Sequence, residues 1–148
     1  MSKRQAIVIG ATGLVGQHLL QRLVESRHYQ QIISISRRPL TDSVDQVQQL
    51  VIEDFAQLAA AVAGLSLHGA DAFSTLGTTQ KQAGSKERFK QIDYGYNLSF
   101  AQACKAAGVE HFLLLSATGA NPKSRIFYNR VKGELERDVA ALAFERLS

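Results

Sequence analysis

The sequence predicts an α/β fold in which a parallel β-sheet is covered by helices on both faces. Short apolar runs alternate with segments of helical periodicity along the chain, a pattern typical of repeated strand–helix units. The apolar runs are continuous rather than interrupted at every second residue, which indicates strands buried on both faces. The chain has 148 residues, of which 45% are hydrophobic and 20% charged, so residues 1–148 are expected to form one domain.

The elements expected from this pattern follow in a simple order. Strands are expected at residues 6–9, 32–36, 47–52, 70–76 and 111–116, with the start of a sixth at 144–148. Helices are expected to begin at Leu14 and to cover residues 55–63, 89–107 and 127–141. The charged segment 81–90 is interpreted as a loop. Because crossovers between parallel strands are right-handed, the expected strand order is 3-2-1-4-5 with a partial sixth strand.

Three glycines lie between the first expected strand and the first helix. Glycines at such a turn permit a tight bend, a close approach of the backbone to a pyrophosphate and close packing of the helix on the strand. The N-terminus of the helix then offers free N–H groups to the phosphates. The turn predicts a doubly wound Rossmann fold that binds a dinucleotide; a flexible turn is the competing interpretation. The residues expected at the pyrophosphate are Gly10, Thr12, Gly13, Leu14, Val15 and Gly16.

The second expected strand ends in Ser36-Arg37-Arg38 rather than in an acidic residue. An Asp or Glu at this place binds the ribose 2′-hydroxyl of NAD, whereas a guanidinium binds a 2′-phosphate with two hydrogen bonds. Arg37 and Arg38 therefore favour NADP(H), with NAD(H) as the alternative cofactor. Arginines that only solvate a loop are the competing interpretation.

The last expected helix carries Tyr128 and Lys132 four residues apart, so both lie on one face of it. A nearby ammonium stabilises a phenolate and brings the pKa of a tyrosine closer to neutral pH, which suits a general acid–base. A hydroxyl at the end of the preceding strand, from Ser116 or Thr118, would polarise a substrate carbonyl. Taken alone, the pair is also compatible with an ordinary surface tyrosine beside a neighbouring lysine.

In series, the glycine turn, Leu76-Gly77-Thr78-Thr79, Leu113-Leu114-Leu115-Ser116 and Tyr128-x-x-x-Lys132 resemble the short-chain dehydrogenase/reductase superfamily. The closer likeness is to its atypical, extended branch, including the Tat-interacting-protein oxidoreductases and bacterial NAD(P)H-binding, sugar-epimerase-like proteins. The resemblance implies the following roles. The three glycines would line the pyrophosphate, Arg37 and Arg38 would bind the 2′-phosphate, and Asp54 would lie near the adenine. Leu76, Gly77 and Thr78 would border the ribose and nicotinamide, Tyr128 would be the acid–base, and Lys132 would bind the nicotinamide ribose.

Two departures from that family pattern affect the expected chemistry. Many extended members have a serine or threonine where this chain has Ala117, so the hydroxyl role would fall to Ser116 or Thr118. The chain ends where a sixth strand begins, so the C-terminal substrate-binding region is expected to be absent from residues 1–148. Asp93 is interpreted either as a functional residue or as a carboxylate that complements a helix dipole.

The function expected from these features is an NADP(H)-dependent oxidoreductase acting on a small carbonyl or alcohol. A dinucleotide-binding redox sensor or regulatory module without turnover is the alternative, and a sugar-nucleotide epimerase or dehydratase is a third candidate. The four histidines show no metal-ligand spacing, and no basic run indicates a nucleic-acid surface. No apolar stretch could span a membrane, and the single cysteine favours a cytoplasmic location. The expected partners are the dinucleotide and an unidentified small substrate, and a homodimer is left open.

Overall fold

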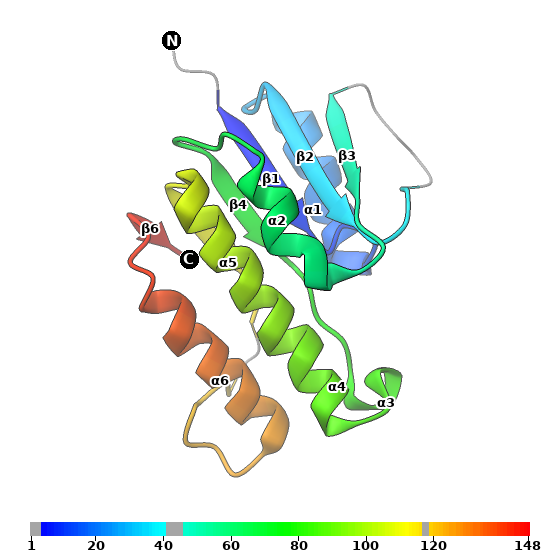
Figure 1. The fold of residues 1–148 in the computed structure, drawn as a ribbon, viewed down its shortest axis with the longest axis vertical. Coiled ribbons are helices and arrows are strands. Elements are labelled where there is room, and N and C mark those ends of the chain that lie inside the picture. The colour runs from blue at the N-terminus through cyan, green and yellow to red at the C-terminus, as the bar shows by residue number, and fades with distance from the viewer. Residues whose placement is uncertain (1–3, 41–45, 117–118) are drawn as a thin grey trace.

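Six parallel strands form one sheet in the order β3-β2-β1-β4-β5-β6 (Figure 1). The structure is a computed structural model that describes residues 4–40, 46–116 and 119–148. The strands are β1 (Gln5–Ile9), β2 (Gln31–Ser36), β3 (Val47–Val51), β4 (Asp71–Ser74), β5 (His111–Leu114) and β6 (Arg146–Leu147). The predicted Rossmann fold, its strand order and the partial sixth strand are therefore confirmed.

Helices cover both faces of this sheet, as Figure 1 shows with α1 behind the strands and α2, α5 and α6 in front. The helices are α1 (Leu14–Ser26), α2 (Leu58–Ala63), α3 (Gln80–Ala83), α4 (Lys86–Lys90), α5 (Asn97–Ala107) and α6 (Phe127–Ala140). A short 3-10 helix, η1 (Phe55–Gln57), precedes α2, and a π-helical segment, η2 (Gln91–Tyr96), joins α4 to α5.

Two apolar layers hold the helices on the sheet. The layer under α2, α5 and α6 contains Ile7, Ile9, Phe100 and Phe112, all fully buried. The layer on the α1 side is smaller and contains Val8. Residues Ala6–Ile9 have no exposed surface, as expected of a central strand covered on both faces. The most deeply buried strand of the sheet therefore leads directly into the glycine-rich turn.

The segment after β4 differs from the sequence prediction of a loop at 81–90: it forms the two short helices α3 and α4, separated by Gly84 and Ser85. The Thr79 hydroxyl accepts a hydrogen bond from the backbone N–H of Gln82 and caps α3. Gly84, with φ of +88°, ends α3 in the left-handed conformation that glycine adopts most easily. The Ser85 hydroxyl then caps α4. Helix caps thus stabilise two short helices in a segment whose charged residues favoured the prediction of a loop.

The sixth strand is short but in register with the sheet. Arg146 and Leu147 pair with His111 and Phe112, and the ring of Phe144 stacks on that of Phe112 at a centroid distance of 5.0 Å. Within the described residues, no helix combines the length and the hydropathy that a membrane crossing requires.

Candidate functional site

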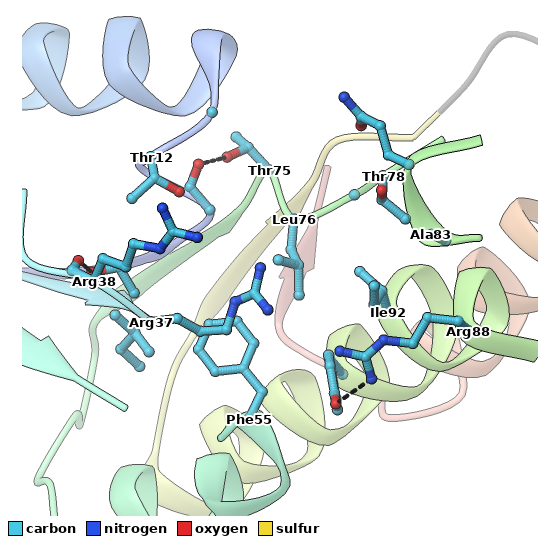
Figure 2. A pocket seen from close by; sticks show the side chains of 17 residues that line it. Thr12, Arg37, Arg38, Phe55, Thr75, Leu76, Thr78, Ala83, Arg88 and Ile92 are labelled. Carbon is cyan, nitrogen blue, oxygen red and sulfur yellow. Dashed lines mark hydrogen bonds between the residues drawn. The ribbon is translucent and has the colours of Figure 1, made fainter. Parts of the chain in front are cut away.

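A cleft of about 590 Å³ lies where β1, β2 and β4 end, at the carboxyl edge of the sheet (Figure 2). Ligands of doubly wound folds bind at this edge, where the strand order reverses. The lining comes from four places in the sequence: the glycine turn, the end of β2 with Phe55, the segment after β4, and the α3–η2 helices. The lining residues are Gly10, Thr12, Gly13, Ile35, Ser36, Arg37, Arg38, Phe55, Thr75, Leu76, Gly77, Thr78, Gln82, Ala83, Arg88, Ile92 and Tyr96.

The glycine turn is shaped by two close backbone approaches. Gly10 has φ of +94°, and a Cβ there would lie 2.6 Å from Thr75 Oγ1. A Cβ at Gly16 would lie 2.0 Å from the carbonyl oxygen of Gly10. A side chain at Gly16 would therefore push the start of α1 away from the turn, and one at Gly10 would clash with the segment after β4. Gly13 is the N-cap of α1 and supplies no side-chain cap, so the first N–H groups of the helix remain available to an anion.

The six residues expected at the pyrophosphate take different places around this turn. Gly10, Thr12 and Gly13 line the cleft, while Gly16 is buried against the turn itself. The side chains of Leu14 and Val15, in the first turn of α1, are 75% and 53% exposed.

The end of β2 brings two exposed arginines to one side of the cleft. The guanidinium of Arg37 lies 5.9 Å from the centre of the Phe55 ring, and the Ser36 hydroxyl donates a 2.5 Å hydrogen bond to the carbonyl oxygen of Arg38. Asp54, expected near the adenine, does not line the cleft. Its exposed carboxylate accepts a hydrogen bond from Ala56 N and caps η1.

A third arginine, which the sequence does not predict as a site residue, faces the cleft from α4. Figure 2 shows Arg88 beside Ile92, across the cleft from Arg37. Its guanidinium donates hydrogen bonds to Gln91 Oε1 at 2.6 Å and to the hydroxyl of Tyr96 at 3.1 Å. The charged lining residues are thus Arg37, Arg38 and Arg88, with no carboxylate among the described residues that line the cleft. This charge suits a ligand that carries phosphates.

The segment after β4 is anchored from both sides. Thr75 Oγ1 donates a 3.1 Å hydrogen bond to the Gly10 carbonyl oxygen. From behind, Asn97 Nδ2 donates to the carbonyl oxygen of Leu76 at 3.0 Å, and the N–H of Thr78 donates to Asp93 Oδ2 at 3.0 Å. The floor of the cleft is therefore tied to the glycine turn, to η2 and to the first residue of α5.

None of the expected catalytic residues that the structure describes belongs to the lining of the cleft. Lys132 is buried, pairs with Asp93 and lies 5.7 Å from the centre of the Tyr128 ring. The Tyr128 ring packs on Phe89 at 5.3 Å. Ser116 Oγ is buried and finds no hydrogen-bond partner among the described residues. The alternative hydroxyl, that of Thr118, falls outside the described residues.

The position of Asp93 differs from the helix start that is one of the two interpretations of its carboxylate from the sequence. Asp93 lies instead within the π-helical turn, fully buried, with both carboxylate oxygens engaged by Lys132 and Thr78. Its lysine partner is 39 residues away in the sequence, so no local pattern could reveal the contact. Within the part of the chain that the structure describes, no group of three or more His, Cys, Asp or Glu side chains could hold a metal ion.

Comparison with known proteins gives the family. The profile of a family described as NAD(P)H-binding matches residues 10–143. The chain is 45% identical over 141 residues to protein FMP52, mitochondrial, of Debaryomyces hansenii, covering 95% of this chain and 62% of that protein. The chain thus spans less than two thirds of the length of this relative.

Solved structures share the fold at low sequence identity. The Bordetella bronchiseptica enzyme WbmH in complex with NAD+ has a TM-score of 0.78 at 14% identity, covering 98% of this chain and 55% of that one. A short-chain dehydrogenase/reductase superfamily protein from Agrobacterium tumefaciens with bound NAD has a TM-score of 0.67 at 19% identity, covering 91% and 44%. The predicted resemblance to NAD(P)-binding proteins of this type is confirmed.

The expectation of a cytoplasmic protein is wrong, since the Debaryomyces relative is named as mitochondrial. The composition and the single cysteine, Cys104, report only on whether thiols stay reduced, and they do not distinguish one such compartment from another. The profile match covers most of the chain and includes the glycine turn, the arginines after β2 and the helix of Tyr128 and Lys132. The chain belongs to the NAD(P)H-binding family.

Proposed function

We propose that this chain is the cofactor-binding part of an NADP(H)-dependent oxidoreductase of the short-chain dehydrogenase type, acting on a small carbonyl or alcohol. The observation that carries the proposal is a cleft with anion-binding groups whose floor lies against Lys132. The uncapped start of α1 and three arginines face the cleft. The Lys132 ammonium lies behind Gly77 on the cleft floor, and the Tyr128 ring lies beside Lys132. A phosphate-binding cleft beside a tyrosine–lysine pair suits hydride transfer better than storage of a nucleotide.

Different residues of the cleft are assigned to different parts of the dinucleotide. In this proposal the free N–H groups of α1 bind the pyrophosphate, and Leu14 and Val15 lose exposed apolar surface against the cofactor. Arg37 and Arg38 bind the adenosine 2′-phosphate, and Phe55, Ile92 and Tyr96 enclose the adenine. Asp54, which caps η1, contributes through the position it gives to Phe55 rather than by contact with the base.

The chemistry is assigned to three side chains. NADP(H) supplies the hydride when bound. The Tyr128 hydroxyl moves the proton to or from the substrate oxygen, and the Lys132 ammonium holds the nicotinamide ribose. Ser116 Oγ polarises the substrate carbonyl; its buried hydroxyl, which finds no partner among the described residues, is the kind of group that a substrate would satisfy.

The test is turnover by the full-length protein with a panel of small aldehydes and ketones. Loss of the reduced-nicotinamide absorbance is followed with NADPH, and products are identified by mass spectrometry. The proposal expects carbonyl-dependent oxidation of NADPH that falls strongly in Ser116→Ala and not in Ser124→Ala, a control hydroxyl that caps a surface turn. Tight NADPH binding with no reduction of any carbonyl would favour a binding module instead.

A further inference from the structure

The π-helical turn at Gln91–Tyr96 places one carboxylate in an unusual position. Asp93 has no exposed surface, and it lies on the wide turn that interrupts an otherwise continuous run from α4 to α5. Such π-turns occur frequently at functional sites. Asn97 donates a 2.8 Å hydrogen bond to the carbonyl oxygen of Asp93, which steadies the widened turn.

The two carboxylate oxygens of Asp93 serve different elements. Oδ1 pairs with the ammonium of Lys132 on α6, and Oδ2 accepts the backbone N–H of Thr78 after β4. The side chains of the pair are 0% and 6% exposed. A buried ion pair is expensive to desolvate and is often no more stabilising than apolar residues of the same volume. A stabilising contribution alone is therefore a weak explanation for the pair.

The pair lies directly behind the floor of the cleft. A Cβ at Gly77 would be 3.2 Å from Asp93 Oδ1 and 3.5 Å from Lys132 Nζ, and Gly77 itself lines the cleft. The absence of a side chain at Gly77 thus leaves the ammonium next to the space where a ligand would lie. An ammonium has three N–H donors. One contact with Asp93 therefore leaves two donors, one for a ribose hydroxyl and one directed toward Tyr128.

We propose that Asp93 is a positioning residue that fixes the Lys132 ammonium and the Gly77–Thr78 backbone as one unit at the ribose end of the cleft. The inference rests on the proposed function and deepens it, because it names the group that orients the lysine. Without the carboxylate, the flexible lysine side chain is free to leave the cleft floor. The Thr78 N–H would also lose its acceptor.

The Arg4–Asp71 pair provides a matched comparison within the same protein. It too joins a carboxylate to a cation and to a third group, the hydroxyl of Tyr29. It lies at the start of β4, at the opposite edge of the sheet from the cleft. Removing its charge should lower stability without touching the cofactor.

The experiment is a double-mutant cycle on NADP+ affinity with Asp93→Asn, Lys132→Met and the double variant, measured by isothermal titration. Each single variant is expected to weaken binding about tenfold, the loss of one charge-assisted hydrogen bond. The double variant is expected to match Lys132→Met within about twofold, since Asp93 acts through Lys132. Asp71→Asn is the control, expected to lower the unfolding midpoint and to leave the affinity unchanged.

Lys132→Met leaves a buried carboxylate without its partner, which could prevent folding. A second measurement therefore tests the proposal without this variant. The Lys132 ammonium signal is observed by nitrogen-15 NMR in wild type and in Asp93→Asn. A signal protected from exchange in wild type, shifted by saturating NADP+ and lost in Asp93→Asn, supports the proposal. Wild-type affinity, or a wild-type NADP+-dependent shift, in Asp93→Asn overturns it. Failure of the wild type to bind NADP+ overturns the proposed function and the inference with it.

Discussion

The three arginines of the cleft differ in how firmly the protein holds them. Arg88 is fixed by Gln91 and Tyr96, whereas Arg37 and Arg38 are exposed and free to turn toward a ligand. A guanidinium that is already bonded to neighbours suits packing against a base. Exposed guanidiniums at the end of β2 suit a phosphate that arrives with the cofactor.

Replacing both exposed arginines should therefore abolish a preference for NADPH over NADH. The Arg37→Ala/Arg38→Ala variant is expected to bind NADPH about tenfold more weakly, since solvent-exposed charged contacts contribute only about 0.2–1 kcal/mol each. Its affinity for NADH should change little. Fluorescence titration of both cofactors measures the difference, with Arg22→Ala on the exposed face of α1 as the control for net charge. Equal affinities of the wild type for NADPH and NADH would contradict the assignment.

Tyr128 and Tyr94 provide a matched pair of phenols for the catalytic assignment. Tyr128 lies beside Lys132, whereas the Tyr94 hydroxyl bonds Asp138. Tyr128→Phe in the full-length protein should lower turnover by about 10²–10⁴, the usual contribution of a general acid–base, and should retain cofactor affinity. Steady-state kinetics and a binding titration check both parts, and Tyr94→Phe should remain active. Near-normal turnover by Tyr128→Phe would remove the tyrosine from the mechanism.

The strands, the main helices and the glycine turn could be predicted because their signals are local. An apolar run or a glycine spacing is complete within a few residues. The α3–α4 segment was missed although its caps, Thr79, Gly84 and Ser85, are also local, because its charge favoured a loop. Asp93 and Arg88 could not be assigned, because what they do depends on residues that the fold brings together from other elements.

The position of α6 depends on a glycine that no motif marked. A Cβ at Gly133 would lie 2.2 Å from the carbonyl carbon of Asn121 and 2.3 Å from Pro122 N. The helix therefore packs directly on the backbone of the loop before it. Tyr128 and Lys132 lie on the same helix, so this packing helps to set their distance from the cleft.

Gly133→Ala should push α6 away from that loop. Although alanine favours a helix interior over glycine, the clash is expected to cost about 1–3 kcal/mol of unfolding free energy and to lower turnover. Chemical denaturation and kinetics measure the two effects. Gly64→Ala is the control, because its Cβ would meet nothing closer than 3.7 Å. A stabilised Gly133→Ala protein with full activity would show that α6 does not need this contact.

At the scale of the whole molecule, the carboxyl ends and the amino ends of the strands have different roles. The carboxyl edge carries the cleft. At the amino edge, Asp71 accepts hydrogen bonds from Arg4 and from Tyr29, which joins the start of the chain to β4. Burial of the Asp71 carboxyl opposes its charged form, but these hydrogen bonds outweigh burial and hold its pKa below the ordinary value.

This lowered pKa makes a prediction for acid stability. A carboxyl whose pKa is lower in the folded state stabilises the protein above its unfolded pKa of about 3.9, and the contribution disappears as pH falls through the folded value. The unfolding free energy should therefore decrease on acidification below about pH 5. In Asp71→Asn the decrease should be shallower and the stability near neutral pH lower. Denaturation curves across this range test it, and an unchanged slope in the variant would assign the acid sensitivity to other groups.

The most direct test of the account is isothermal titration of the purified chain with NADPH, repeated in the presence of 2′,5′-ADP. The account predicts saturable binding of one NADPH per chain, competed by the adenosine fragment because the arginines and the glycine turn bind that half of the cofactor. No saturable binding at millimolar NADPH, or binding that 2′,5′-ADP does not displace, would contradict the claim that this cleft is an NADP(H) site.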